Sequence, residues 1–111
     1  MVLRVEKVGD VTVVALLGEL DASNVPQFKR HIAPVLEASS KVVFDVGQLQ
    51  FIDSSGLGAI LSCLRQVNAA GGDLKLCGLL PPVHAPFALV RMHTILKIYN
   101  TKDEAVQAFQ A

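Results

Sequence analysis

Hydrophobic and polar residues alternate along the chain with two different periods, which predict strands and helices in turn. Residues 2–7 alternate with a period of two, with Leu3 and Val5 on one side and Arg4 and Glu6 on the other. This alternation predicts a half-buried strand. Further apolar segments predict strands over residues 11–17, 41–46, 73–77 and 95–99.

Apolar residues at helical spacing predict two helices in the first two thirds of the chain. The first begins near Ser23 or Asn24, either of which can cap it, and Pro34 predicts a kink or an early end. Its predicted buried face consists of Val25, Phe28, Ile32, Val35 and Leu36. The second helix ends at Gly71-Gly72, as helices often end at glycine. Its predicted buried face consists of Leu57, Ile60, Leu61, Leu64 and Val67.

Two more helices are predicted towards the end of the chain. Pro81-Pro82 opens a third helix, whose apolar residues are Val83, Phe87 and Val90. Residues 101–104, Thr-Lys-Asp-Glu, form a capping box that opens the last helix. Its predicted inward residues are Ala105, Val106 and Phe109.

The order of these elements, β-β-α-β-α-β-α-β-α, predicts an α/β fold. Gly9-Asp10 is typical of the tight turn of a hairpin, so the first two strands are expected to pair antiparallel. Later strands alternate with helices, which favours parallel pairing with helical crossovers. We therefore expect a mixed, mostly parallel sheet of four to five strands with about four helices. The 111 residues, 51% of them hydrophobic, fit a single domain over residues 1–111.

Charge and cysteine content exclude several classes of function. Lys plus Arg equals Asp plus Glu, ten each, so no basic excess favours nucleic acid. The uncharged apolar runs are too short for a membrane span, and the N-terminal residues do not form a signal peptide, so we expect no membrane insertion. Cys63 and Cys77 lack the close pairing of zinc ligands. They are interpreted as reduced, buried cysteines of a cytoplasmic protein, and no metal site is expected.

Residues 49–61 carry the most informative motif in the chain. Apolar Phe51 and Ile52 are followed directly by Asp53-Ser54-Ser55-Gly56, and an amphipathic helix then begins. The start of a helix has free backbone N–H groups and a partial positive charge. A hydroxyl there either caps the helix or carries a phosphate. From the residues alone, capping is the favoured interpretation, and the same holds for Asp21 before Ser23.

Catalytic and nucleotide-binding interpretations of this motif fail on its residues. Asp53-Ser54-Ser55-Gly56 lacks the first glycine of Gly-x-Ser-x-Gly, and all three histidines, His31, His84 and His93, lie on predicted helices or at their ends. The third glycine of a dinucleotide-binding motif would fall at Leu61, and no Gly-Lys-Ser/Thr is present. We therefore expect no catalytic residues, no cofactor and no enzyme activity.

The motif is one of four blocks that together resemble a known family. They are Gly18-Glu19-Leu20-Asp21, Val42-Val43-Phe44-Asp45, the block from Phe51 to Gly58, and Gly71-Gly72-Asp73-Leu74-Lys75-Leu76. In order and spacing these blocks resemble the STAS domain family, and within it the bacterial anti-sigma factor antagonists. The resemblance covers essentially the whole chain. One departure is Met92-His93-Thr94, where many relatives carry a Thr/Ser-Gly-Leu segment.

The resemblance implies a phosphorylation switch, with Ser54 as the phosphorylated residue. The implied partner is an anti-sigma factor with a histidine-kinase-like ATPase fold that also acts as a serine kinase. Unphosphorylated antagonist binds it and frees a sigma factor, phosphorylated antagonist releases it, and a serine phosphatase resets the cycle. The expected partner-binding residues are Asp21, Asp53, Ser54, Ser55, Gly56, Leu57 and Gly58.

Particular roles are expected for these residues. Asp53, and Asp21 if the two motif loops meet, would place acidic groups beside the phosphate. Ser55 is expected to support the turn or cap the helix, whereas Leu57 and Gly58 would shape the apolar, close-approach part of the interface. Two alternatives remain: a non-switching STAS subunit of a lipid-transport ATPase or signalling assembly, and an enzyme or nucleotide-binding protein.

Overall fold

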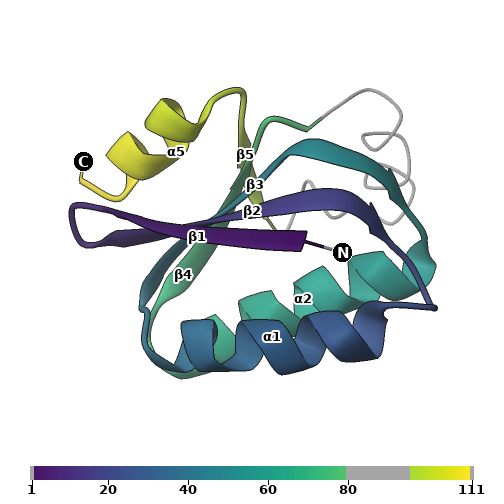
Figure 1. The fold of residues 1–111 in the computed structure, drawn as a ribbon. Helices are drawn as coiled ribbons and strands as arrows, with labels where there is room; N and C mark the ends of the chain where they lie inside the picture. The colour runs from purple at the N-terminus through teal and green to yellow at the C-terminus, as the bar shows by residue number, and fades with distance from the viewer. Residues whose placement is uncertain (1, 80–95, 111) are drawn as a thin grey trace.

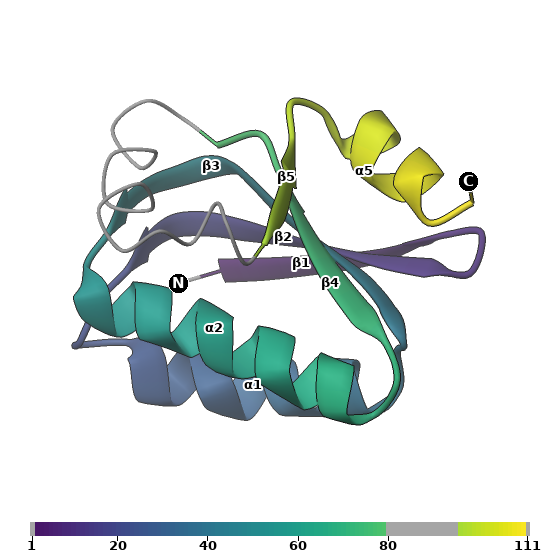
Figure 2. The same ribbon diagram turned by 180° about the vertical axis from the view of Figure 1, so that it is seen from behind.

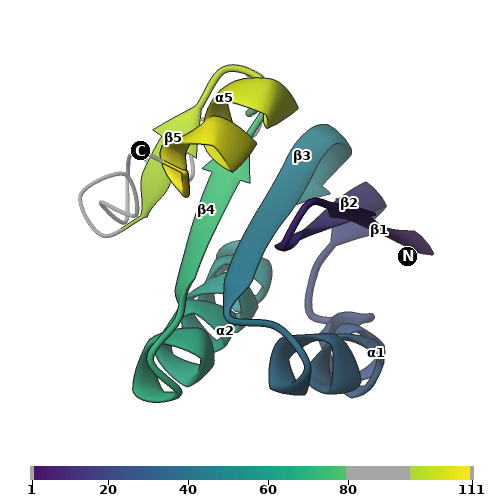
Figure 3. The same cartoon turned by 90° about the vertical axis from the view of Figure 1, so that its left-hand side faces the viewer.

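The computed structural model describes residues 2–79 and 96–110, and in them five strands form one mixed sheet. The strand order is β1-β2-β3-β4-β5, with β1 and β2 antiparallel and every other neighbouring pair parallel (Figures 1 and 3). The strands are β1 (Val2–Val8), β2 (Val11–Leu20), β3 (Lys41–Ile52), β4 (Asp73–Cys77) and β5 (Lys97–Tyr99). The predicted hairpin and mostly parallel sheet are therefore confirmed.

Helices cover both faces of this sheet. Helices α1 (Val25–Glu37) and α2 (Ser54–Ala69) lie side by side on one face, and α5 (Lys102–Ala108) lies on the other (Figures 1 and 2). The capping box of α5 is confirmed, because the Glu104 N–H donates to the Thr101 hydroxyl at 3.2 Å. The helix predicted after Pro81-Pro82 and the Met92-His93-Thr94 segment lie outside the described residues.

The main core lies between the sheet and the pair α1 and α2. Phe28 of α1 meets Phe44 of β3 edge to face, with ring centroids 6.3 Å apart, and both side chains are fully buried. Each such side chain contributes about 1.5–3 kcal/mol through burial. All ten residues predicted as buried faces of the first two helices are buried in this core or packed against it.

Proline 34 does not end α1, so the predicted early end is wrong. The helix continues to Glu37, and the Ala38 N–H still donates to the Pro34 carbonyl at 3.2 Å. Pro34 itself is exposed, whereas Ile32 and Leu36 on either side are buried. A proline removes one helical hydrogen bond, and we attribute the survival of the helix to the burial of these neighbours.

Strand β1 is less buried than its alternation predicts. Leu3 packs against the main core, but Val5, two residues further along the same side, is 51% exposed. The reason is position, because β1 is the outermost strand of the sheet. The helices that cover the sheet extend over only part of this outermost strand. Residues of β1 that the helices do not reach stay exposed.

A smaller core lies under α5 on the opposite face. It contains Cys77 of β4 together with Ala105 and Val106 of α5. Both cysteines are free and buried, as predicted, and burial raises the pKa of the Cys63 and Cys77 thiols to about 12. A thiol with so high a pKa carries almost no reactive thiolate at neutral pH.

Candidate functional site

The two motif loops meet at one end of the sheet. Strands β2 and β3 run further than predicted, to Leu20 and Ile52, and these two residues pair in the parallel register. Directly beyond them, the Asp53 N–H donates to the Leu20 carbonyl at 3.3 Å. Because the strands are parallel and adjacent, their carboxyl ends lie together, and Asp21 and Asp53 follow them at the same end of the sheet. The predicted proximity of the two loops is thus confirmed.

The Asp53 carboxylate joins the two loops directly. Its Oδ1 accepts from the Gly56 N–H at 2.8 Å, which makes Asp53 the N-cap of α2. Its Oδ2 accepts from the Ala22 N–H, in the loop after β2, at 3.0 Å. One side chain therefore both caps the helix and links two segments that lie 31 positions apart in sequence. The capping role considered for Ser55 belongs to Asp53.

Asp21 organises the loop between β2 and α1. Its carboxylate accepts from both the backbone N–H of Ser23, at 2.9 Å, and the Ser23 hydroxyl, at 2.5 Å. These two donors lower the pKa of Asp21, because they stabilise its charged form. Asp21 therefore carries a negative charge at neutral pH.

Asn24 is a structural residue of the site whose role the sequence did not reveal. It stands at the N-cap position of α1 but makes no side-chain cap hydrogen bond. Instead, its side-chain amide donates to the Glu19 carbonyl at 2.8 Å, and its Oδ1 accepts from the Asp21 N–H at 3.0 Å. An asparagine directly before a helix predicts a helix cap. Only the tertiary structure shows that Asn24 instead holds the loop between β2 and α1.

The exposed side of the α2 start presents small residues. Ser54 is the first residue of α2, and Ser54, Ser55 and Gly58 are all exposed. None of the side-chain hydrogen bonds found within residues 2–79 and 96–110 uses the Ser54 hydroxyl. A Cβ added at Gly58 would meet no atom of residues 2–79 and 96–110 within 4 Å. The backbone at Gly58 is therefore open to close approach from outside.

The inner side of the same helix start is packed into the fold. A Cβ added at Gly56 would lie 2.5 Å from the Leu20 carbonyl oxygen and 2.6 Å from Ile52 Cγ1. Leu57 is only 4% exposed and belongs to the main core. The expectation that Leu57 offers apolar surface to a partner does not fit this placement, because the helix turns this residue towards the sheet.

Phe51 is an exposed residue of the site that the hydrophobic pattern did not identify. It lies at the end of β3, two residues before Asp53, and is 49% exposed although Leu49 and Ile52 are buried. The register between β2 and β3 shifts at Gly18/Glu19, which inserts one extra residue into β3. This bulge changes the alternation, so Phe51 turns outward. We call Asp21, Phe51, Ser54, Ser55 and Gly58 the Ser54 surface.

Little in the described part of the chain indicates chemistry of another kind. Within residues 2–79 and 96–110, no group of three or more His, Cys, Asp or Glu side chains could hold a metal ion. His31 lies on α1, as predicted, and is exposed, whereas His84 and His93 lie outside the described residues. None of the described helices is both long and apolar enough to cross a membrane.

Fold and site together define a small α/β domain class in which a serine motif opens a helix at the end of a mixed sheet. The family model described as "STAS domain" matches residues 3–105. The chain therefore belongs to the STAS domain family.

Named relatives in this family are anti-sigma factor antagonists. The anti-sigma F factor antagonist of Paenibacillus polymyxa is 34% identical over 98 residues, covering 86% of this chain and 84% of the relative. BtrV of Bordetella bronchiseptica, named as a candidate anti-sigma factor antagonist, is 29% identical over 111 residues, covering 99% of this chain and 96% of that protein.

Solved structures agree with the fold. A candidate anti-sigma factor antagonist from Thermotoga maritima, TM1081, superposes with a TM-score of 0.91 at 26% identity, covering 98% of this chain and 95% of that one. The Bacillus cell fate determinant SpoIIAA in its phosphorylated form superposes with a TM-score of 0.74 at 26% identity, covering 97% and 99%.

Proposed function

We propose that this chain is a cytoplasmic anti-sigma factor antagonist that is switched by phosphorylation of Ser54. The observation that carries the proposal is the position of Ser54. It is an exposed hydroxyl at the first residue of α2, in the motif through which the sequence resembles anti-sigma factor antagonists, at the junction of two loops. A structural relative solved in its phosphorylated form supports a phosphate on this fold.

Phosphorylation of Ser54 would change the surface without disturbing the core. A phosphate adds about −1.5 to −2 charges at neutral pH. The N-terminus of α2 favours negative charge, whereas Asp21 and Asp53 nearby oppose it. The hydrogen bonds of Asp53 are made to Gly56 and Ala22 and do not involve the Ser54 hydroxyl. The expected result is a folded protein whose Ser54 surface has become strongly negative.

The proposed partner is an anti-sigma factor with a histidine-kinase-like ATPase fold that acts as a serine kinase. It would bind the unphosphorylated Ser54 surface, where Phe51 offers an aromatic anchor and Gly58 allows close approach. A serine phosphatase would restore binding. A coupling of about 1–3 kcal/mol between phosphorylation and binding is enough to change affinity by about 5–150-fold.

Intact-mass measurement on protein purified from its native host tests the site. We expect a species heavier by one phosphoryl group that disappears after phosphatase treatment and is absent from Ser54→Ala. Ser55→Ala and Ser62→Ala are matched controls, because both serines are exposed on the same helix. If Ser54→Ala is phosphorylated to the same extent as wild type, Ser54 is not the phosphorylation site.

A pull-down from the same host tests the switch. Wild type and Ser54→Ala should recover a small ATPase of the anti-sigma kinase class, and Ser54→Asp should recover at least about fivefold less. Equal recovery by all three variants would contradict the switch. Recovery of a lipid-transport ATPase regardless of the state of Ser54 would instead favour the non-switching STAS subunit.

A further inference from the structure

Strand β1 leaves one edge of the sheet unpaired among the described residues. It is the outermost strand, on the far side of the sheet from β5 (Figure 3). Five of its seven residues are exposed and the other two are half-buried. An open edge presents a row of backbone N–H and C=O groups that can pair with another strand.

The sequence of β1 is complementary to itself in one antiparallel register. When Val5 lies opposite Val5 of a second copy, all seven residues are paired and Arg4 lies opposite Glu6 in both directions. A shift of two residues one way places Arg4 opposite Arg4, and a shift the other way places Glu6 opposite Glu6. The register with the longest ladder is therefore also the one in which the charges attract.

Exposed apolar side chains make this edge suited to burial. Val2 and Val5 are 56% and 51% exposed, two of the three large hydrophobic side chains exposed within the described ranges. They lie at opposite faces of the strand, because their positions differ by three. Charges of a single sign along β1 would repel a second copy, as charged edge strands often do. The opposite signs of Arg4 and Glu6 do not.

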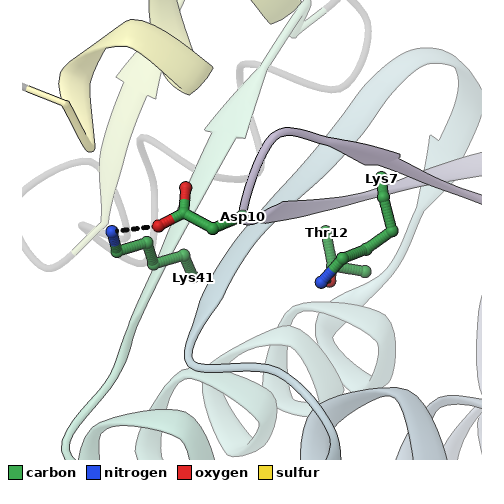
Figure 4. A network of polar contacts seen from close by, with 4 residues as sticks. All are labelled: Lys7, Asp10, Thr12 and Lys41. Atoms are coloured by element: carbon green, nitrogen blue, oxygen red, sulfur yellow. Dashed lines mark hydrogen bonds and ion pairs between the residues drawn. The ribbon is translucent and has the colours of Figure 1, made fainter.

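Contacts inside the molecule hold the edge in place for pairing. At the turn between β1 and β2, Asp10 is paired with Lys41 of β3 at 2.6 Å (Figure 4). Lys7 donates to the Thr12 hydroxyl at 3.2 Å, so its side chain turns towards its own sheet. Glu6 is paired with Lys102 at 2.9 Å, which leaves its second carboxylate oxygen for another cation.

We propose that β1 pairs with β1 of a second copy of this chain in an antiparallel ladder across a two-fold axis. The two sheets then continue into one sheet with Val5 at its centre. A ladder of seven residues is a small interface, so the dimer is weak and depends on protein concentration.

Sedimentation velocity over a range of concentrations tests the proposal with charge reversals. Wild type should shift from monomer to dimer as concentration rises. Arg4→Glu and Glu6→Arg alone should each weaken self-association about tenfold, because both ion pairs become like-charge pairs. An equimolar mixture of the two variants should form heterodimers, and the double variant Arg4→Glu/Glu6→Arg should dimerise again.

The mixture and the double variant separate strand pairing from effects on folding. Glu6→Arg also loses the Lys102 pair, which neither rescue restores, so recovery reports the contact between strands. Arg65→Glu, an exposed reversal on α2, is the matched control and should leave association unchanged. The proposal is overturned if wild type stays monomeric up to its solubility limit, or if the mixture associates no better than each variant alone.

Discussion

The inner and outer sides of the first turns of α2 differ sharply in burial, although their residues are adjacent in the sequence. On the inner side, the Leu20 carbonyl leaves no room for a Cβ at Gly56, and Leu57 is packed in the main core. On the outer side, Ser54 and Ser55 directly before these two residues and Gly58 directly after them are exposed. Residues adjacent in sequence thus serve the fold and the surface separately. The proposed phosphorylation of Ser54 would therefore add its charge on the outer side, away from the core.

The two glycines of the motif show this difference most clearly. Gly56 is required because there is no room for a Cβ, whereas a Cβ at Gly58 would have open space among the residues that the structure describes. A glycine inside a helix costs stability relative to alanine. Packing within residues 2–79 and 96–110 gives no reason for a glycine at position 58, whereas the proposed close approach of a partner to the Ser54 surface would give one.

The largest expected effect is that of Gly56→Ala. The new Cβ would fall 2.5 Å from a backbone oxygen, so α2 must move away from β2. We expect the free energy of unfolding to fall by about 3 kcal/mol, as measured by urea denaturation. A variant as stable as wild type would show that the inner side is not constrained, and the comparison between the two sides would fail.

An intermediate effect is expected for Asp53→Ala. This change removes the helix cap and the hydrogen bond from the Ala22 N–H, so we expect a loss of about 1–3 kcal/mol of stability. Asp21→Ala is the matched control, since the hydrogen bonds that the structure gives to the Asp21 carboxylate within residues 2–79 and 96–110 come from its own loop, from the Ser23 N–H and hydroxyl. If thermal denaturation shows the control to be equally destabilised, the link between the loops is not the source of the effect.

The smallest expected effect on stability, and the one of opposite sign, is that of Gly58→Ala. Without a clash, alanine should stabilise α2 by about 0.5–1 kcal/mol. Binding to the partner recovered by pull-down should nevertheless weaken, because the added methyl group stands on the Ser54 surface. Ser62→Ala, further along the exposed side of α2, should leave binding unchanged. Stronger binding by Gly58→Ala would argue against close approach at this position.

The sequence by itself determined the elements and the candidate serine. Local patterns carry this information: the period of two in β1, the helical spacing in α1 and α2, the Gly9-Asp10 turn and the capping box at Thr101. Each depends on interactions between residues close in the chain, so each can be recognised without knowledge of the fold. The family blocks then indicated Ser54, which the structure places at the first residue of α2.

Only the tertiary structure decided which residues of the motif face outward. The bulge between β2 and β3 turns Phe51 out, and the neighbouring Leu20 carbonyl makes Gly56 obligatory. The edge position of β1 leaves Val5 exposed despite its alternation. These outcomes depend on strand register and on contacts between segments far apart in the chain. These outcomes cannot be predicted from the hydrophobic period alone. The period specifies which residues share a face but not what covers that face.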